Sequence, residues 1–160
     1  MDKFPHVLMQ IAQVEDKRCA ALCSRLADEF EDDLLEYEQF PDAYFDFVLT
    51  LLLSAQYYSR PGIWNFLMAV NNAKDALTEQ QYASLAAAFT EKFSNYADKD
   101  LSFAVCDFAA RNYSIEQAES LLQRLKQQEL KKPQEMQGDV AQGFYILGQE
   151  KKRAGHITLK

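Results

Sequence analysis

The chain has 160 residues, of which 48% are hydrophobic, so it can form one domain with a core of normal size. Five glycines and four prolines supply few turns, which argues against a many-stranded β fold and favours long helices. The net charge of −7 argues against direct nucleic-acid binding, because such binding draws most of its affinity from Lys and Arg side chains on phosphates.

The acidic charge is concentrated in the first third of the chain. Residues 1–50 carry 12 acidic and 4 basic side chains, whereas residues 51–160 carry 12 acidic and 13 basic ones. The net charge therefore belongs to the N-terminal elements, and the rest of the chain is close to neutral.

Four helices are predicted in the N-terminal part of the chain. Apolar side chains fall on one face over 5–14 and again over 15–38, which predicts two amphipathic helices. Pro41 suits the first turn of a third helix, which we expect to reach residue 58. The sequence Ser-Arg-Pro-Gly at 59–62 is the clearest turn in the chain, and a fourth helix is expected to follow it.

Capping residues mark the start of the later helices. Thr78 with Gln81, and Ser114 with Gln117, match the capping box and predict the starts of the fifth and seventh helices. Asp98 is the expected cap of the sixth helix. Short turns between these segments make neighbouring helices antiparallel.

The pattern predicts an all-α protein with about seven or eight helices. Two-helix units start at Pro41, Thr78 and Ser114, a spacing of about 37 residues that suits either a small α-solenoid of stacked hairpins or a compact bundle. We expect one domain over 1–160: acidic helices at about 1–40, hairpins at 41–132, and a C-terminal segment at 133–160 that holds a helix over about 139–152 and a short basic tail. The predicted core comprises Leu26, Phe30, Phe47, Leu51, Phe66, Leu67, Leu85, Phe89, Val105, Phe108, Leu121 and Leu125.

Seven acidic side chains crowd the end of the second predicted helix. Asp32, Asp33 and Glu36 fit a DDxxE pattern, in which carboxylates one turn apart share magnesium, but no second metal motif accompanies it. The acids otherwise form a solvated helix face or a surface that docks a protein. The candidate docking residues are Asp28, Glu29, Glu31, Asp32, Asp33, Glu36 and Glu38.

A second candidate surface surrounds the turn at 59–62. Tyr57, Tyr58, Arg60 and Trp64 cluster there, and Tyr, Trp and Arg are the residues most enriched in binding hot spots. The alternative is that these side chains simply pack the helical hairpin.

Little in the sequence suggests catalysis, a cofactor or a membrane. Cys19, Cys23 and Cys106 are too few for a disulfide framework and predict reduced thiols in a cytoplasmic protein, the first two packed in the core. The two histidines form no ligand pattern, so we assign no catalytic, metal or cofactor residue and expect no enzyme. The most apolar stretch, 43–55, is too short to span a bilayer.

The hairpin run resembles the α-helical, HEAT-like immunity proteins of bacterial toxin systems, including contact-dependent inhibition. The most similar stretches are TEQQYASL at 78–85 and DKDLSFAVCDFAAR at 98–111, within a resemblance over about 40–132. It implies an inhibitor that occludes a cognate toxin domain. Where that toxin is a nuclease with a basic cleft, an acidic helix face complements it.

Two other functions remain open. One is a helical-repeat adaptor or chaperone for an intracellular assembly, which would dock its partner in a concave groove. The other is a small metal-dependent enzyme that uses Asp32, Asp33 and Glu36. The sequence leaves the oligomeric state open.

Overall fold

The prediction of an all-α protein is confirmed. A computed structural model describes residues 3–158, with the side chains of residues 3–155, so the end of the basic tail lies outside the described residues. Within that range there is no strand, and eight helices of at least nine residues accompany one of four residues. They are α1 Phe4–Gln13, α2 Asp16–Leu34, α3 Asp42–Leu53, α4 Ala55–Tyr58, α5 Trp64–Asn72, α6 Glu79–Lys92, α7 Lys99–Asn112, α8 Ile115–Glu129 and α9 Asp139–Thr158.

The predicted caps hold the later helices in place. The Thr78 hydroxyl accepts a bond from the Gln81 amide N–H, and the Gln81 side chain accepts one from the Thr78 N–H, at 3.1 and 3.0 Å. Ser114 and Gln117 form the same reciprocal pair at the start of α8. These bonds satisfy amide groups that the first turn of a helix leaves free.

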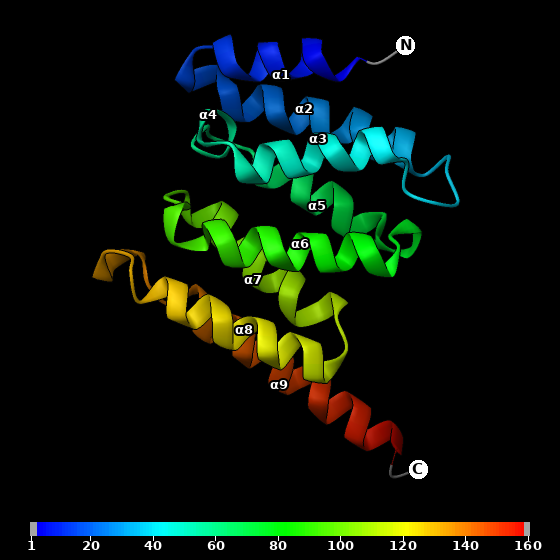
Figure 1. Cartoon of the computed structure of the whole chain (residues 1–160), viewed down its shortest axis with the longest axis vertical. Helices are drawn as coiled ribbons and strands as arrows, with labels where there is room; N and C mark the ends of the chain where they lie inside the picture. The colour runs from blue at the N-terminus through cyan, green and yellow to red at the C-terminus, as the bar shows by residue number, and fades with distance from the viewer. Residues whose placement is uncertain (1–2, 159–160) are drawn as a thin grey trace. The chain divides into compact units, whose positions relative to one another are not determined.

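The chain divides into two compact units, Met1–Ala88 and Phe89–Lys160, here called the N-terminal and C-terminal units. In the N-terminal unit α1 packs on α2 and α4, and α2 packs on α5; in the C-terminal unit α7, α8 and α9 pack on one another (Figure 1). All twelve predicted core residues are buried.

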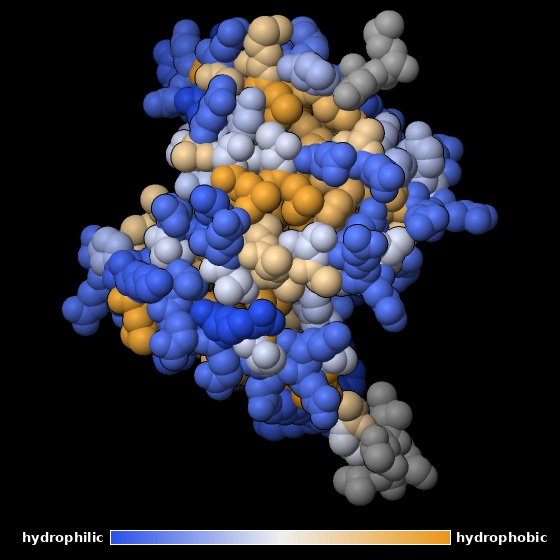
Figure 2. All heavy atoms as spheres, viewed as in Figure 1, coloured by the Kyte–Doolittle hydropathy of each residue, from blue (hydrophilic) through white to orange (hydrophobic). Residues whose placement is uncertain are grey.

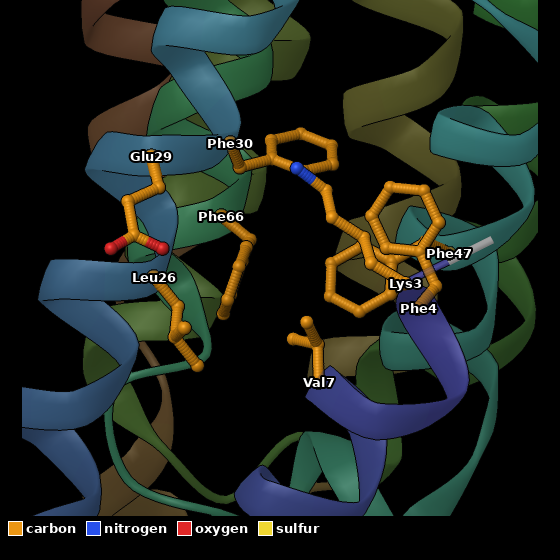
Figure 3. A pocket seen from close by; sticks show the side chains of 8 residues that line it. All are labelled: Lys3, Phe4, Val7, Leu26, Glu29, Phe30, Phe47 and Phe66. Atoms are coloured by element: carbon orange, nitrogen blue, oxygen red, sulfur yellow. The ribbon is translucent and has the colours of Figure 1, made fainter. Parts of the chain in front are cut away.

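Aromatic rings fill the core of the N-terminal unit. The Phe30 ring on α2 lies 5.5 Å from Phe47 and 6.0 Å from Phe66, and Phe4 stacks on Phe47 at 4.7 Å. Figure 3 shows these rings around a pocket of only about 40 Å³. Each such ring contributes a large buried area, so this cluster joins α1, α2, α3 and α5.

The second predicted helix ends four residues earlier than expected, at Leu34. The amides of Glu36 and Tyr37 bond to carbonyls three residues back, which closes the helix with a tight turn. Carboxylates at a helix C-terminus oppose its dipole, and the residue before Pro41 is disfavoured in the α region. The prediction that Glu36 and Glu38 lie on a helix face is therefore wrong.

The third predicted helix is interrupted at Ser54. This residue adopts an extended conformation between α3 and α4, and its carbonyl accepts bonds from the amides of Tyr57 and Tyr58. Serine is a weaker helix former than the leucines that precede it, although its side chain forms no cap hydrogen bond at this break. At the other end of the chain, α9 continues to Thr158, beyond the predicted residue 152.

Gly62 permits a close approach between the turn at 59–62 and α2. Its φ of +92° is strained for other residues, and a Cβ there would lie 2.7 Å from the Ala20 Cα. We expect Gly62→Ala to destabilise the protein by about 2–4 kcal/mol, from strain and overpacking.

Gly148 is the matched control for that substitution. It lies inside α9, and a Cβ there would meet nothing within 4 Å. Gly148→Ala should stabilise the protein by about 0.5–1 kcal/mol, because alanine is the better helix former. Urea denaturation measures both changes, and equal effects of the two substitutions would contradict the packing described for Gly62.

Candidate functional site

The acidic end of α2, defined as the seven carboxylates from Asp28 to Glu38, divides into paired and unpaired groups. Asp33 forms an ion pair with Lys3 and accepts a 3.3 Å hydrogen bond from the Tyr44 hydroxyl. Glu31 accepts a 2.9 Å bond from the Asn72 amide, and Glu29 lies 3.9 Å from Arg25. These three side chains therefore have partners within the N-terminal unit.

The other four carboxylates are exposed and form no ion pair or hydrogen bond with the described residues. Between them lie two exposed apolar side chains, Leu35 with 64% of its surface exposed and Tyr37 with 47%. Aromatic anchors bordered by charged groups are typical of binding surfaces. We call the set the acidic tip; it consists of Asp28, Asp32, Leu35, Glu36, Tyr37 and Glu38.

The DDxxE residues are not brought together. Asp32 and Glu36 are exposed, whereas Asp33 is held by Lys3 and Tyr44. Among the described residues, no group of three His, Cys, Asp or Glu side chains is placed to hold a metal ion. The geometry gives the magnesium hypothesis no support.

The cluster around residues 57–64 is largely engaged in packing. Arg60 donates to the carbonyl oxygens of Ile11, at 3.1 Å, and Val14, and pairs with Asp16 at 2.5 Å. Tyr58 is buried, and Tyr57 and Trp64 are half-buried. Arg60 thus satisfies carbonyls that the end of α1 leaves free and joins them to the start of α2.

The three thiols are free and buried. Cys19 and Cys23 lie one turn apart with their Sγ atoms 4.0 Å from each other, and burial raises the pKa of Cys23 to about 12. Burial also raises the pKa of Cys106. Because the thiolate is the reactive form, none of this favours a nucleophile, and the prediction of Cys19 and Cys23 as packed core thiols is confirmed.

The C-terminal unit buries charged side chains that the sequence did not single out. The Lys132 ammonium, on a side chain with only 5% exposure, donates to the Ser102 hydroxyl at 2.5 Å and lies 4.1 Å from the centre of the Phe93 ring. Nearby, the buried Glu129 accepts bonds from amides at the start of α9, and Asp139 pairs with Lys99 at 3.4 Å.

This polar network does not form an accessible site. Ser102 is completely buried, so its closeness to a lysine offers no route for a substrate. The hydrogen bonds of this network instead hold the segment between α8 and α9 against α7, which is a structural role.

A groove between α3 and the start of α6 is a surface feature that the sequence did not indicate. It has a volume of about 740 Å³ and lies within the N-terminal unit. Asp42, Phe45, Asp46 and Leu49 line it from α3, and the first turns of α6 line it from the other side. The Gln81 side chain donates to the Phe40 carbonyl at 3.1 Å and so ties the groove to the loop that carries the acidic tip.

Comparison with known proteins gives no family. No protein-family model matches the chain, and no curated protein or solved structure shows significant similarity to it. None of the described helices is both long and apolar enough to cross a membrane.

The buried ammonium of Lys132 predicts a pH dependence of stability. Burial lowers the pKa of Lys132 from the usual 10.5. At pH values between the lowered pKa and 10.5, the unfolded chain therefore binds more protons than the folded one. The free energy of unfolding should then rise with pH between the folded-state pKa and 10.5. Lys132→Met should remove that rise, as measured by urea denaturation from neutral to alkaline pH.

Lys131 is the control, since it neighbours Lys132 but is exposed. Lys131→Met should leave the pH profile parallel to that of the wild type. A Lys132→Met profile that also runs parallel would show that Lys132 titrates as an exposed lysine.

Proposed function

We propose that this chain is a protein-binding inhibitor, of the kind that its resemblance to immunity proteins implies, and that the acidic tip contacts a basic partner. The single observation that carries the proposal is the exposure of Leu35 and Tyr37 between carboxylates that have no partner among the described residues.

Charge supports this assignment. Asp28 and Asp32 are like charges one turn apart, an arrangement that costs a few tenths of a kcal/mol. A basic partner relieves this repulsion in the complex and gains association rate by electrostatic steering. A toxin domain with a basic cleft for phosphate, such as a nuclease, has the required charge.

The shape of the tip also supports a docking role. The end of α2 and the following turn project Leu35 into solvent, although burying a leucine is favourable by about 1.5–3 kcal/mol. Tyr37 adds an aromatic ring held 5.7 Å from Tyr44, so part of its side-chain order exists before binding.

Charge reversal of the tip tests the proposal. The protein tested as the partner is the one encoded by the adjacent reading frame, and the variant combines Asp32→Lys, Glu36→Lys and Glu38→Lys. We expect the affinity to fall about 10- to 100-fold, mainly through a slower association rate that depends less on salt. Surface plasmon resonance at two salt concentrations measures this, and protection of growth in cells that express the partner measures inhibition.

A matched control changes the net charge by the same amount elsewhere. Glu91, Glu116 and Glu135 are exposed and form no ion pair with the described residues, so reversing all three to Lys should leave affinity nearly unchanged. Equal losses of affinity in both variants would show that the change in net charge alone causes the effect. If the wild type does not bind this protein, the proposal that the chain is its inhibitor is refuted.

A further inference from the structure

The groove between α3 and α6 is lined mainly by polar side chains, with two apolar ones, Phe45 and Leu49, on α3. Helix α3 is hydrophobic on most of its surface, a composition typical of a helix covered on all sides. Yet Leu49 is half-exposed, and with Phe45 it faces the groove. Figure 2 shows hydrophobic residues gathered on the surface over α3 and toward α6, with hydrophilic residues around them.

The rim of the groove is acidic. Asp42 and Asp46 on α3 and Glu79 on α6 are exposed, and the residues that line the groove include neither Lys nor Arg. In the first turn of α6 the Gln81 amide already donates to the Thr78 hydroxyl, so that donor is not open to a ligand. Anions are therefore disfavoured, and a cationic ligand is favoured.

We propose that this groove binds a basic amphipathic helix of a partner protein, with the apolar face of that helix on Leu49, beside the largely buried Phe45, and its Lys or Arg side chains on the three carboxylates. Laying a helix in a groove between two helices is a common mode of recognition. The part of α3 that lines the groove, from Asp42 to Leu49, extends about 12 Å, which is enough for two turns of a bound helix.

The groove adjoins the acidic tip. The groove proposal therefore rests on the proposed function, in which a partner contacts that tip. Gln39 lines the groove and directly follows Glu38. The Phe40 N–H donates to the Ala76 carbonyl at 2.9 Å, so the loop is fixed at the edge of the groove by backbone as well as by Gln81. A partner that contacts the tip can extend a helix into the groove without a gap.

The experiment uses a synthetic probe. A fluorescein-labelled peptide of about 12 residues, with leucines on one helical face and lysines on the other, is titrated with the full chain and followed by anisotropy. Its twin carries glutamates in place of the lysines. We expect the lysine peptide to bind and the twin to bind at least tenfold more weakly. Absence of binding by the lysine peptide, or equal binding of the twin, would overturn the proposal.

Two substitutions locate the peptide. Ser84 lines the groove and is half-buried, so Ser84→Trp should fill it and weaken binding at least tenfold without altering charge. Its neighbour Ala83 is exposed and does not line the groove, so Ala83→Trp should have no effect. Circular dichroism checks that both variants remain folded.

The carboxylates are tested by neutral replacements of nearly the same shape. Asp42→Asn, Asp46→Asn and Glu79→Gln together should weaken the lysine peptide about tenfold, as expected for three exposed ion pairs. Undiminished binding to this variant, or to Ser84→Trp, would place the peptide elsewhere and refute the groove.

The two proposals fail separately. If the protein from the adjacent reading frame binds Ser84→Trp as well as the wild type but loses affinity for the reversed tip, the groove proposal falls and the proposed function stands. If that protein does not bind at all, the proposed function falls, and the peptide titration still decides whether the groove accepts a basic helix.

Discussion

The crowding of carboxylates at the C-terminal end of α2 is the constraint on which much of the N-terminal unit depends. Negative charge at the negative end of a helix dipole is unfavourable, and here α2 ends at Leu34 while acidic residues continue beyond it. The released segment turns back and buries Phe40, whose ring lies 6.4 Å from Phe30 and 5.9 Å from Phe45. One electrostatic conflict thus exposes Leu35 and Tyr37 and brings the loop to the edge of the groove.

Within the acidic end, ion pairs and a hydrogen bond distinguish the carboxylates that stabilise the fold from those that are left for a partner. Asp33, Glu31 and Glu29 are paired with Lys3, Asn72 and Arg25. The pairs with Lys3 and Asn72 connect α2 to the start of α1 and the end of α5. The carboxylates that remain face water on the side where the chain leaves the helix. The same run of acids therefore supplies both contacts within the fold and the surface assigned to a partner.

Features encoded by neighbours in sequence could be predicted, and features that depend on distant groups could not. The capping boxes at Thr78 and Ser114 and the core positions of Phe30 and Phe89 follow from local spacing. The burial of Lys132 could not be inferred, because it depends on Ser102, thirty residues away, and on the ring of Phe93. The groove depends likewise on residues of α3 and of the start of α6, which are more than 30 residues apart in sequence, so no local pattern specifies it.

The three bonds of Arg60 constrain the order in which the chain can fold. A helix of ten residues such as α1 does not persist alone in water, and the carbonyls at its end have no partner until a donor arrives. That donor lies 49 residues further along from Ile11, so the contact closes a long loop. During synthesis, α1 is made well before Arg60, so its end acquires these bonds only after the chain has been made as far as residue 60.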